Sequence, residues 1–580
     1  MAKVIINDIP VEALNDASIL DAAKEVDIFI PTLCHLDLES FNIEHRTGSC
    51  RVCMVEVELG GRSKMMPACC TPVQDGMKIK TNTPEIIQIR RTVLELLLSD
   101  HPFDCLICAK SLDCELQALA RQFGIDHLTY TGERSSYPRD TSSNAINRDL
   151  DKCIMCRRCE TACNEIQTVK VLTGYKRGFM AVVAPPEMKP LNDTNCVFCG
   201  QCVNVCPTGA LTEINYINPV WKAINDPTKK VIVQTAPAVR VGIGEEFNIP
   251  ENESATGKLV AGLRRLGFDA VFDTDFSADL TIMEEGHELI NRINKNENLP
   301  ILTSCCPGWV NFMEYQFPDL LHIPSTCKSP QQMFGAIAKS YYAEKIGVSP
   351  KDLIVVSIMP CLAKKYEAAK PEFINNGVPD VDYVLSTREL AKMFKEAGIN
   401  IAKLKDEDYD NPLGESTGAG VIFGASGGVL EAALRTVSEV ISKTELKDVN
   451  FVEVRGLEGI KEATVKIGEL DVKVAVTSGL GNARKILEKI RSGEAKYHAI
   501  EIMACPGGCI NGGGQPYIHG DTTKLERRMK MIYTEDERKV IRKSHDNPYI
   551  QKLYKEFLGE PGSKKSHELL HTHYHKKREK

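Results

Sequence analysis

Cysteine in short, regular spacings is the feature that most restricts how this chain can fold. The chain has 22 cysteines in 580 residues: sixteen fall before residue 210, in four groups, and six fall later, at four places. The long stretch between Cys206 and Cys305 contains none. In a reducing cytosol, cysteines grouped in this way are more often metal ligands than disulfide partners. The sequence therefore predicts a metal-rich front region and a body of different character.

Length, charge and hydropathy exclude several classes of protein. A chain of 580 residues is too long for one core, and about three to five domains are expected. A net charge of −7 leaves no basic surface for nucleic acid. The sequence has no run of eighteen apolar residues, so we expect no membrane span. The first residues show neither a secretory nor a twin-arginine signal, which favours a cytoplasmic location.

Two cysteine runs of the same spacing carry the most specific signal. Each reads C-x2-C-x2-C-x3-C, and Pro207 follows the second run. This is the bacterial two-cluster ferredoxin pattern, in which the fourth cysteine of each run binds the other cluster. Zinc sites rarely use such compact runs twice. We expect one [4Fe–4S] cluster on Cys153, Cys156, Cys159 and Cys206, and a second on Cys163, Cys196, Cys199 and Cys202.

The first cysteine group predicts a smaller cluster. Cys50 and Cys53 are flanked sixteen residues away on each side by Cys34 and Cys69. The apolar segments at 3–13, 52–61 and 76–82 are typical of short strands in a small mixed sheet. Four thiolates on such a domain suit a [2Fe–2S] cluster, with zinc as the alternative. Cys70 stands beside Cys69, and we favour it as a spare thiol.

The next group of ligands could hold either of two kinds of metal site; its members are His101, Cys105, Cys108 and Cys114. It follows a helical run at 86–100. One histidine and three cysteines at this spacing suit a structural zinc site and an iron–sulfur cluster equally. Because the group lies between two predicted iron–sulfur modules, we favour a histidine-ligated [4Fe–4S] cluster.

The body has cysteines in turns rich in glycine and proline. The turns are TSCCPGW at 303–309, IPSTCKSPQQMFG at 323–335, SIMPCLAKKYEA at 357–368 and MACPGGCINGGGQP at 503–516. Three of them follow apolar, β-branched runs that predict strands. Open α/β sheets bind ligands beyond the carboxyl ends of their strands. The division between front and body is expected near the polar stretch at 218–230.

With these motifs in place, the chain resembles the [FeFe]-hydrogenases along its whole length, in particular the large clostridial type with four accessory clusters. The front region also resembles, in part, the electron-input subunit of respiratory NADH dehydrogenases. The resemblance implies a multidomain α+β and α/β fold. We expect a small β-grasp [2Fe–2S] domain at 1–80, a histidine-ligated [4Fe–4S] domain at 81–140, a two-[4Fe–4S] ferredoxin-like domain at 141–217, and a two-lobed α/β catalytic domain with a C-terminal helical segment at 218–580.

The resemblance implies an active-site cofactor, the H-cluster: a [4Fe–4S] cubane joined through one cysteine to a two-iron subsite with CO, CN⁻ and azadithiolate. By motif position the cubane ligands would be Cys306, Cys361, Cys505 and the bridging Cys509. Lys364, Ser329 and Gln331 would lie near the two-iron group, with Lys364 facing a cyanide. Backbone contact would come from Pro237 and Ala238, and an apolar wall from Met359, Phe423 and Met503.

Splitting H2 also needs a base and a route for protons to leave. The family's proton relay corresponds here to Cys305, Glu285, Ser325, Glu288 and Arg292. The segment at 281–293 supports this, because Glu285, Glu288 and Arg292 share one face of a helix. A solvated acidic face is the alternative. Cys305, beside a ligand, could pass protons without binding iron, whereas Cys327 has no role.

The implied activity is reversible 2H⁺ + 2e⁻ ⇌ H2, with H2 and protons as substrates and electrons passing through four accessory clusters to or from ferredoxin. One alternative is the catalytic subunit of a complex, with partner subunits that bind flavin and NAD(P) or with a formate dehydrogenase. A remote alternative is a non-catalytic iron–sulfur scaffold or sensor. Hydrogenase maturation proteins are expected to assemble the two-iron subsite. The tail at 566–580, with His567, His571, His573 and His575, is expected to be a solvated, basic end, with stray metal binding as the alternative.

Overall fold

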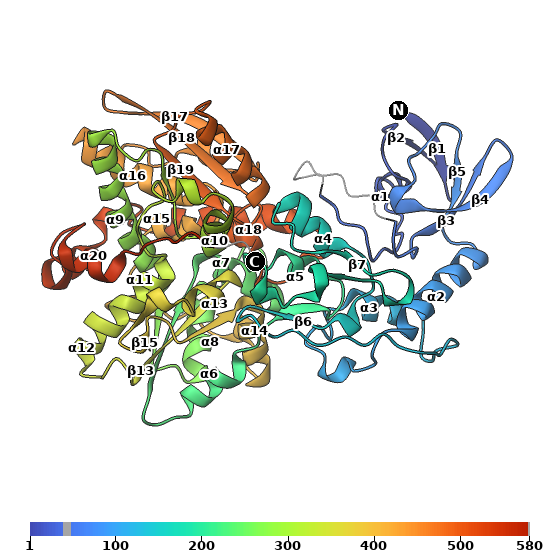
Figure 1. Ribbon diagram of the computed structural model, residues 1–580, viewed down its shortest axis with the longest axis horizontal. Coiled ribbons are helices and arrows are strands. Elements are labelled where there is room, and N and C mark those ends of the chain that lie inside the picture. The colour runs from blue at the N-terminus through green and yellow to red at the C-terminus, as the bar shows by residue number, and fades with distance from the viewer. Residues whose placement is uncertain (39–47, 578–580) are drawn as a thin grey trace.

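The computed structural model describes residues 1–38 and 48–577. A slender front region extends from a larger body (Figure 1). Among the described residues, no helix is both long enough and apolar enough to cross a membrane.

The first domain is a five-stranded mixed sheet of order β2-β1-β5-β3-β4, in which β1 and β5 run parallel. Its strands confirm the three predicted segments. In β1, Ala2, Val4 and Ile6 are buried and alternate with exposed residues, as a half-buried strand requires. The elements are β1 (Ala2–Ile6), β2 (Ile9–Ala13), α1 (Ile19–Lys24), β3 (Met54–Leu59), β4 (Arg62–Pro67) and β5 (Lys78–Lys80).

The helix predicted before His101 is α2 (Pro84–Ser99), which is capped by Thr83 and begins with a proline. A loop region then leads to α3 (Glu115–Gln122). The ferredoxin-like region follows, with the antiparallel pairs β6 (Ile146–Arg148) with β9 (Leu211–Glu213) and β7 (Thr173–Tyr175) with β8 (Val182–Ala184). Between them lie the short helices α4 (Arg158–Thr161) and α5 (Gln201–Val205).

The body contains two four-stranded sheets, one in each lobe. The first has the order β11-β10-β13-β16 and is entirely parallel. Helices α6, α8 and α14 pack on its strands. The elements are α6 (Ile217–Ile224), β10 (Lys230–Thr235), α7 (Pro237–Gly242), α8 (Thr256–Leu266), β11 (Ala270–Asp273), β13 (Leu353–Met359), α13 (Ala363–Ala368), β16 (Tyr383–Ser386) and α14 (Thr387–Glu396).

The second sheet has the order β12-β19-β18-β17, with only β17 antiparallel to its neighbour. Helices α16 and α17 pack on it. The long helix α9 packs against α11, α15 and α16. The elements are α9 (Thr274–Lys295), β12 (Ile301–Leu302), α10 (Pro307–Gln316), α11 (Pro330–Ile337), α15 (Gly418–Val421), α16 (Gly428–Ser442), β17 (Ile460–Ile467), β18 (Leu470–Ser478), α17 (Leu480–Ser492) and β19 (Ala499–Met503).

The ferredoxin-like region shares a hydrophobic core with the second lobe. Phe198 and Val203 are buried in the same cluster as Trp309 and Leu480. The guanidinium group of Arg388, in α14, donates to the Glu213 carboxylate at 3.0 Å and to the carbonyl of Gly513 at 2.7 Å. The first domain, by contrast, belongs to a separate core. The ferredoxin-like region (the twin-cluster region, 141–217) is therefore fastened to the body, whereas the described part of the first domain shares its core with Cys156 of that region and with no residue of the body.

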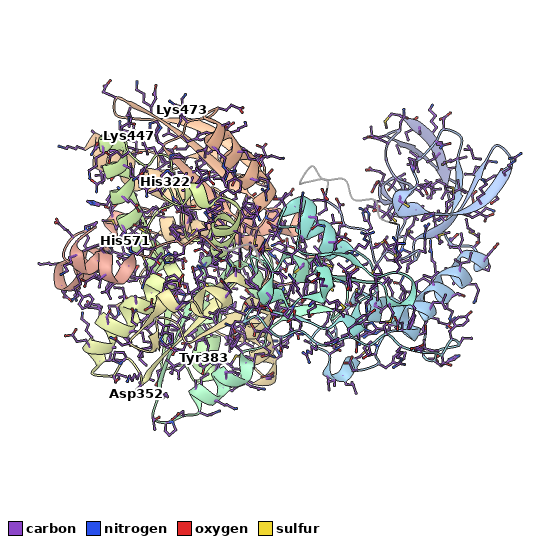
Figure 2. The ribbon with its side chains drawn as sticks, viewed as in Figure 1. His322, Asp352, Tyr383, Lys447, Lys473 and His571 are labelled. Carbon is purple, nitrogen blue, oxygen red and sulfur yellow. The ribbon has the colours of Figure 1, made fainter. Side chains whose placement is uncertain are left out.

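The C-terminal segment begins with α18 (Thr523–Arg538), α19 (Pro548–Leu553) and α20 (Lys564–Leu570). Helix α20 lies at the edge of the body, where His571 is labelled in Figure 2. The prediction of a solvated tail is wrong for residues 571–577. The amide of Thr572 donates to Thr326 O at 2.8 Å, and the hydroxyl of Tyr574 donates to Ser325 O at 2.6 Å. Only His573, His575 and Lys576 of this stretch are exposed, because its backbone pairs with the loop before α11.

Candidate functional site

Four cysteines meet where strands of both lobes end. Cys306 caps α10 just after β12, Cys361 follows β13, and Cys505 and Cys509 follow β19. The strands predicted before these cysteines are confirmed, and their carboxyl ends point to the junction of the two lobes. The pKa of Cys505 is raised mainly by burial, and further by its neighbours Cys361, Cys306 and Cys509. Buried thiols this close together cannot all ionise without a positive centre, so the donor set suits an iron–sulfur cubane.

Glycines allow the backbone to close around this group of thiols. A side chain at Gly508, where φ is 98°, would come within 2.6 Å of the amide nitrogen of Ser426. A side chain at Gly513 would come within 2.7 Å of the carbonyl oxygen of Cys199. Glycine is needed at both positions, for its conformation or for close approach. The second contact brings a cysteine of the twin-cluster region next to the cubane site.

The predicted relay residues lie together on α9 and the loop facing it. The Ser325 hydroxyl donates to Glu288 Oε2 at 3.1 Å, and Arg292 Nη2 donates to Glu288 Oε1 at 2.6 Å. Glu285 is buried, and its Oε1 has no hydrogen-bond partner among the described residues. Burial, and then the negative charge of Glu288, raise the pKa of Glu285 to about 8. A solvated acidic face would not give these properties.

Cys305 lies at the inner end of this series. Burial, followed by the nearby Glu285, raises the pKa of the Cys305 thiol well above its usual range. The thiol therefore stays protonated at neutral pH. It belongs to an apolar cluster that also includes Cys509, the residue expected to bridge to the two-iron group.

Lys364 is buried beside Cys305, with partners that the sequence did not indicate. Its ammonium group donates to the carbonyl of Cys305 at 3.0 Å and to Glu367 Oε2 at 2.9 Å. Burial would lower the pKa of Lys364, but the Glu367 carboxylate holds it above its ordinary value. Glu367 also accepts hydrogen bonds from Ser329 and Gln331. Sequence reasoning missed Glu367, although its place three residues after Lys364 on a helix was a usable signal.

The predicted apolar wall is only partly assembled. Ala238, Phe423 and Met503 belong to the same buried cluster as Cys305 and Cys509, and Pro237 is the buried first residue of α7. Met359, at the end of β13, lies instead in the core of the first lobe. The amide oxygen of Gln331 is buried without a hydrogen-bond partner in the described part of the chain. An apolar enclosure with a few polar groups suits a small organometallic group.

In the first domain, the four predicted ligands are buried together. The Sγ atoms of Cys53 and Cys69 lie 3.4 Å apart. Hydrogen bonding to the Cys34 thiol, ahead of burial, raises the pKa values of Cys50 and Cys69. Cys70 is only half-buried, and its Sγ lies 3.9 Å from the carbonyl oxygen of Pro67, whereas Cys69 is buried with the other three thiols. The geometry favours Cys69 over Cys70 as the ligand.

The histidine group has a donor set ready for a metal. Burial, and then the charge of Lys152, lower the pKa of His101 to about 4, so its ring is neutral at pH 7. Its buried Nδ1 has no hydrogen-bond partner among the described residues. The Cys108 Sγ lies 2.7 Å from where a side chain of Gly209 would begin, and the Glu115 amide, next to Cys114, donates to Pro207 O at 2.9 Å. This group therefore abuts the end of the second ferredoxin run.

The twin-cluster cysteines are grouped in the crossed pattern. Burial is the largest cause that raises the pKa of Cys159, and the next three are the neighbouring thiols of Cys156, Cys206 and Cys153. For Cys202 they are Cys199, Cys196 and Cys163. Each set of four therefore combines three cysteines of one run with one of the other, as the spacing predicts.

The comparisons with known proteins agree with this geometry. Residues 229–513 match the iron only hydrogenase large subunit, C-terminal domain, and residues 522–577 match the iron hydrogenase small subunit. Residues 1–84 match a 2Fe–2S iron–sulfur cluster binding domain, and residues 152–210 match a 4Fe–4S dicluster domain. Residues 90–128 match the NADH-ubiquinone oxidoreductase-G iron–sulfur binding region.

Two curated proteins and one solved structure show how far the similarity to this chain extends. The NADP-reducing hydrogenase subunit HndD of Solidesulfovibrio fructosivorans is 59% identical over 567 residues, covering 97% of this chain and 96% of that one. Iron hydrogenase 1 of Clostridium pasteurianum is 40% identical over 589 residues, covering 99% and 100%. The structure of apo [FeFe]-hydrogenase HydA1 from Chlamydomonas reinhardtii superposes with a TM-score of 0.57 at 45% identity, covering 62% of this chain and 99% of that one.

Proposed function

We propose how protons and electrons move through this chain, which belongs to the iron-only hydrogenase family. It is an iron hydrogenase that catalyses 2H⁺ + 2e⁻ ⇌ H2. The observation that carries the proposal is the series from the half-buried Cys305, beside four converging cysteines, through the buried Glu285 to Glu288, whose side chain is 16% exposed.

The site would hold the H-cluster, with Cys306, Cys361, Cys505 and Cys509 on its cubane and Cys509 as the bridging ligand. When bound, the two-iron subsite supplies the metal at which H2 is split or formed. Lys364, fixed by Glu367, provides a positive charge for a cyanide, and Ser329 and Gln331 lie on the same carboxylate. Pro237, Ala238, Phe423 and Met503 keep water scarce, while Met359 supports them from the first lobe's core.

Protons would leave through the relay. Cys305 holds a proton because burial raises its pKa, and Glu285 can both hold and release one near neutral pH. Ser325 donates to Glu288, and Arg292 fixes Glu288 near solvent, where the carboxylate is 16% exposed. General acid–base transfer of this kind requires groups whose pKa values lie close to the working pH.

Electrons would pass through one [2Fe–2S] and three [4Fe–4S] clusters, bound by the predicted residues. The cluster on Cys163, Cys196, Cys199 and Cys202 would lie next to the cubane, a position supported by the close approach of Gly513 to Cys199. The other ferredoxin-like cluster has two neighbours. Cys156 shares the core of the first domain, and the carbonyl of Pro207 accepts from the amide of Glu115 in the histidine module, which is the region at 81–140 that contains His101. Electrons could therefore reach this cluster from either the first domain or the histidine module. The proposed domains are 1–80, 81–140, 141–217 and 218–580.

The histidine module carries an apolar surface suited to a redox partner. Leu106, Ile107 and Leu112 are more than four-fifths exposed, and Phe103 is half exposed. Such a patch on a soluble domain marks a protein interface. Since a 59% identical relative is named as a subunit of an NADP-reducing hydrogenase, we infer a cytoplasmic complex with flavin- and NAD(P)-binding subunits. Ferredoxin and a formate dehydrogenase are the alternative partners, and maturation proteins would supply the two-iron subsite.

An infrared spectrum of anaerobically matured protein, with an H2-evolution assay using reduced viologen, tests the activity. Sharp CO and CN⁻ bands together with H2 release are expected. A chain with its full iron–sulfur complement that is supplied with the two-iron subsite, yet shows neither the bands nor H2 release, would be a scaffold. That alternative is disfavoured because Cys305, Lys364 and all four cubane cysteines are present.

The partner is tested by substitution in the apolar patch. The double change Leu106→Ser and Ile107→Ser should weaken turnover with flavin-containing partner chains that co-purify, and leave viologen-driven turnover unchanged. The same change at Leu59 and Val452, which are exposed elsewhere, is the control. Efficient ferredoxin-linked turnover by an isolated monomer would instead favour the simple hydrogenase.

A further inference from the structure

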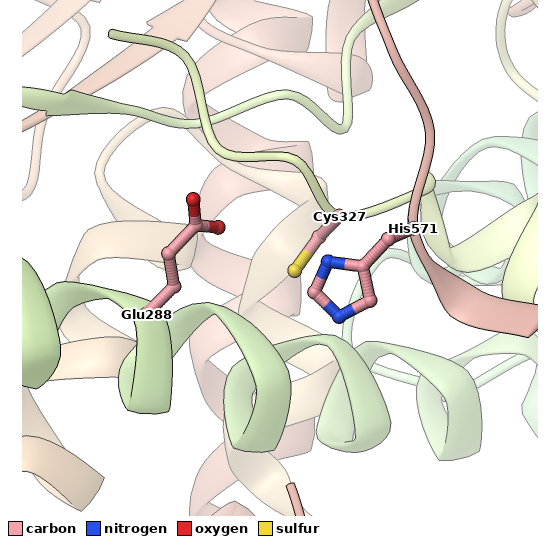
Figure 3. Close-up of side chains that lie close together, drawn as sticks. All are labelled: Glu288, Cys327 and His571. Carbon is pink, nitrogen blue, oxygen red and sulfur yellow. The ribbon is translucent and has the colours of Figure 1, made fainter. Parts of the chain in front are cut away.

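Three metal-binding side chains meet at the outer end of the relay. Glu288 comes from α9, Cys327 from the loop before α11, and His571 from the tail after α20. One ligand atom of each lies within 4.8 Å of the others (Figure 3). Cys327 and His571 are held opposite each other by a backbone bridge between the loop and the tail. These segments are more than 200 residues apart in sequence, and only the packing of the tail brings them together.

His571 is oriented as a ligand histidine would be. Its Nε2 lies 3.0 Å from Glu284 Oε2, and its Nδ1 lies 2.7 Å from the hydroxyl of Thr326, next to Cys327. Burial would raise the pKa of Glu284, but hydrogen bonds from His571, Ser566 and Tyr554 hold it below its ordinary value. With the Glu284 carboxylate accepting from Nε2, Nδ1 is the acceptor nitrogen; the Thr326 hydroxyl donates to it and would be displaced by a bound cation. Metal-binding histidines commonly have such a carboxylate behind them.

The donor set selects for a borderline-soft cation. Thiolate, imidazole and carboxylate together suit Zn²⁺ and disfavour Mg²⁺ and Ca²⁺, which prefer oxygen alone. Zinc bonds of about 2.0–2.3 Å require donors about 3.5 Å apart, so the side chains must close by about 1 Å. One sulfur and one nitrogen are too few for an iron–sulfur cluster. The cation can enter where protons leave, because the Glu288 side chain is 16% exposed.

We propose that Glu288, Cys327 and His571 bind a Zn²⁺-like divalent cation, and that this cation inhibits turnover by occupying Glu288. In binding, Zn²⁺ takes the place of the Cys327 thiol proton, which passes to solvent, and no electron is transferred. The binding site stands on its own geometry, whereas the inhibition rests on the proposed relay.

The test uses the full chain with all its clusters, titrated with Zn²⁺ buffered by a chelator. We expect one zinc per chain, with a Zn K-edge absorption spectrum containing one sulfur near 2.3 Å and nitrogen or oxygen near 2.0 Å. H2 evolution from reduced viologen should fall by about 10²-fold, with iron content unchanged and activity restored by excess chelator.

Cys327→Ala should keep the basal turnover while losing both the bound zinc and the inhibition. Cys327→Ser serves the same purpose if the alanine variant accumulates poorly. His573→Ala is the matched control, because it removes an exposed histidine of the same tail and should behave as the unaltered protein. Zinc retained by Cys327→Ala but lost from His573→Ala would overturn the site in favour of adventitious binding to the tail.

The two parts of the inference fail separately. Zinc that binds with one sulfur ligand and depends on Cys327, yet leaves H2 evolution unchanged, would support the site and overturn the route of protons through Glu288. Absence of such a zinc from a chain that still evolves H2 would overturn the site and leave the proposed function intact.

Discussion

The front and the body of this protein build metal sites in opposite ways. In the twin-cluster region, Cys153, Cys156 and Cys159 lie within seven residues of one another in sequence. In the body, Cys306, Cys361 and Cys505 come from loops up to 199 residues apart, held together by two sheets. A site with three of its four ligands in one short loop needs little more than that loop and one residue of the other run. A site made at the junction of two lobes requires the whole body to fold.

The two regions also differ in exposure. The histidine module presents Leu106 and Ile107 to solvent, as a surface that exchanges electrons with a partner would. The body surrounds Cys305 and Lys364, and the proposed relay would connect this site to solvent through Glu285, Ser325 and Glu288. Electrons can cross a protein surface at an exposed cluster, whereas protons require a continuous series of donors and acceptors. The difference predicts that changes in the body affect every electron donor equally, and that changes in the front affect only some donors.

The largest effect is expected at the inner end of the relay. Cys305→Ala should reduce H2 evolution by about 10³-fold with every electron donor, because a general acid at the active site is lost. Iron content and the CO and CN⁻ infrared bands should be unchanged. Cys327→Ala, which also removes a buried thiol, is the control. Near-normal turnover by Cys305→Ala would contradict the relay.

A second prediction concerns the junction between front and body. Arg388→Ala leaves the buried Glu213 carboxylate without its partner and should destabilise the contact by about 3–5 kcal/mol. The measurement is hydrogen exchange at 211–213 and 513–515. Arg491→Ala, which breaks the exposed pair with Asp319, should cost no more than about 1 kcal/mol. Equal effects of the two changes would mean that the front is not fastened to the body through Arg388.

A third prediction uses the pH dependence of the relay. Because the pKa of Glu285 is raised to about 8, the carboxyl is protonated below that pH and loses its proton above it. H2 evolution should therefore fall as the pH rises through about 8. Glu288→Gln removes one of the causes of that shift and should move the alkaline limb down by about one pH unit, besides lowering the rate. Glu297→Gln, at an exposed position just after α9, should leave the limb in place.

The smallest effect on viologen-driven turnover is expected in the front. His101→Ala should remove or alter one [4Fe–4S] cluster, seen as a loss of iron and of one electron paramagnetic resonance signal. Turnover with a partner protein should fall, whereas viologen can reduce the remaining clusters and turnover should persist. His127→Ala, at an exposed histidine of the same region, should change neither. An equal loss with both donors would contradict the separation of the two regions.

Much of the fold could be predicted from local pattern. The strands before Cys306, Cys361 and Cys505 are runs of β-branched and apolar residues, and the helix carrying Glu285 has the expected spacing. The prediction of the tail failed because its polar, histidine-rich residues suggest solvent, while its backbone pairs with the loop before α11. Glu367 was missed because a Lys–Glu pair on a helix is usually a surface feature, and only burial gives it a role.

The sequence alone indicated which residues should bind clusters in the front, because most of the predicted ligands of each cluster stand a few residues apart in one loop. It also indicated the cysteine turns of the body, through their motifs. Only the tertiary structure decided what surrounds them: Glu367 behind Lys364, Arg388 across the junction, and His571 beside Glu288. These contacts join segments far apart in the chain, and their energies come from burial and charge that exist only after the lobes have packed.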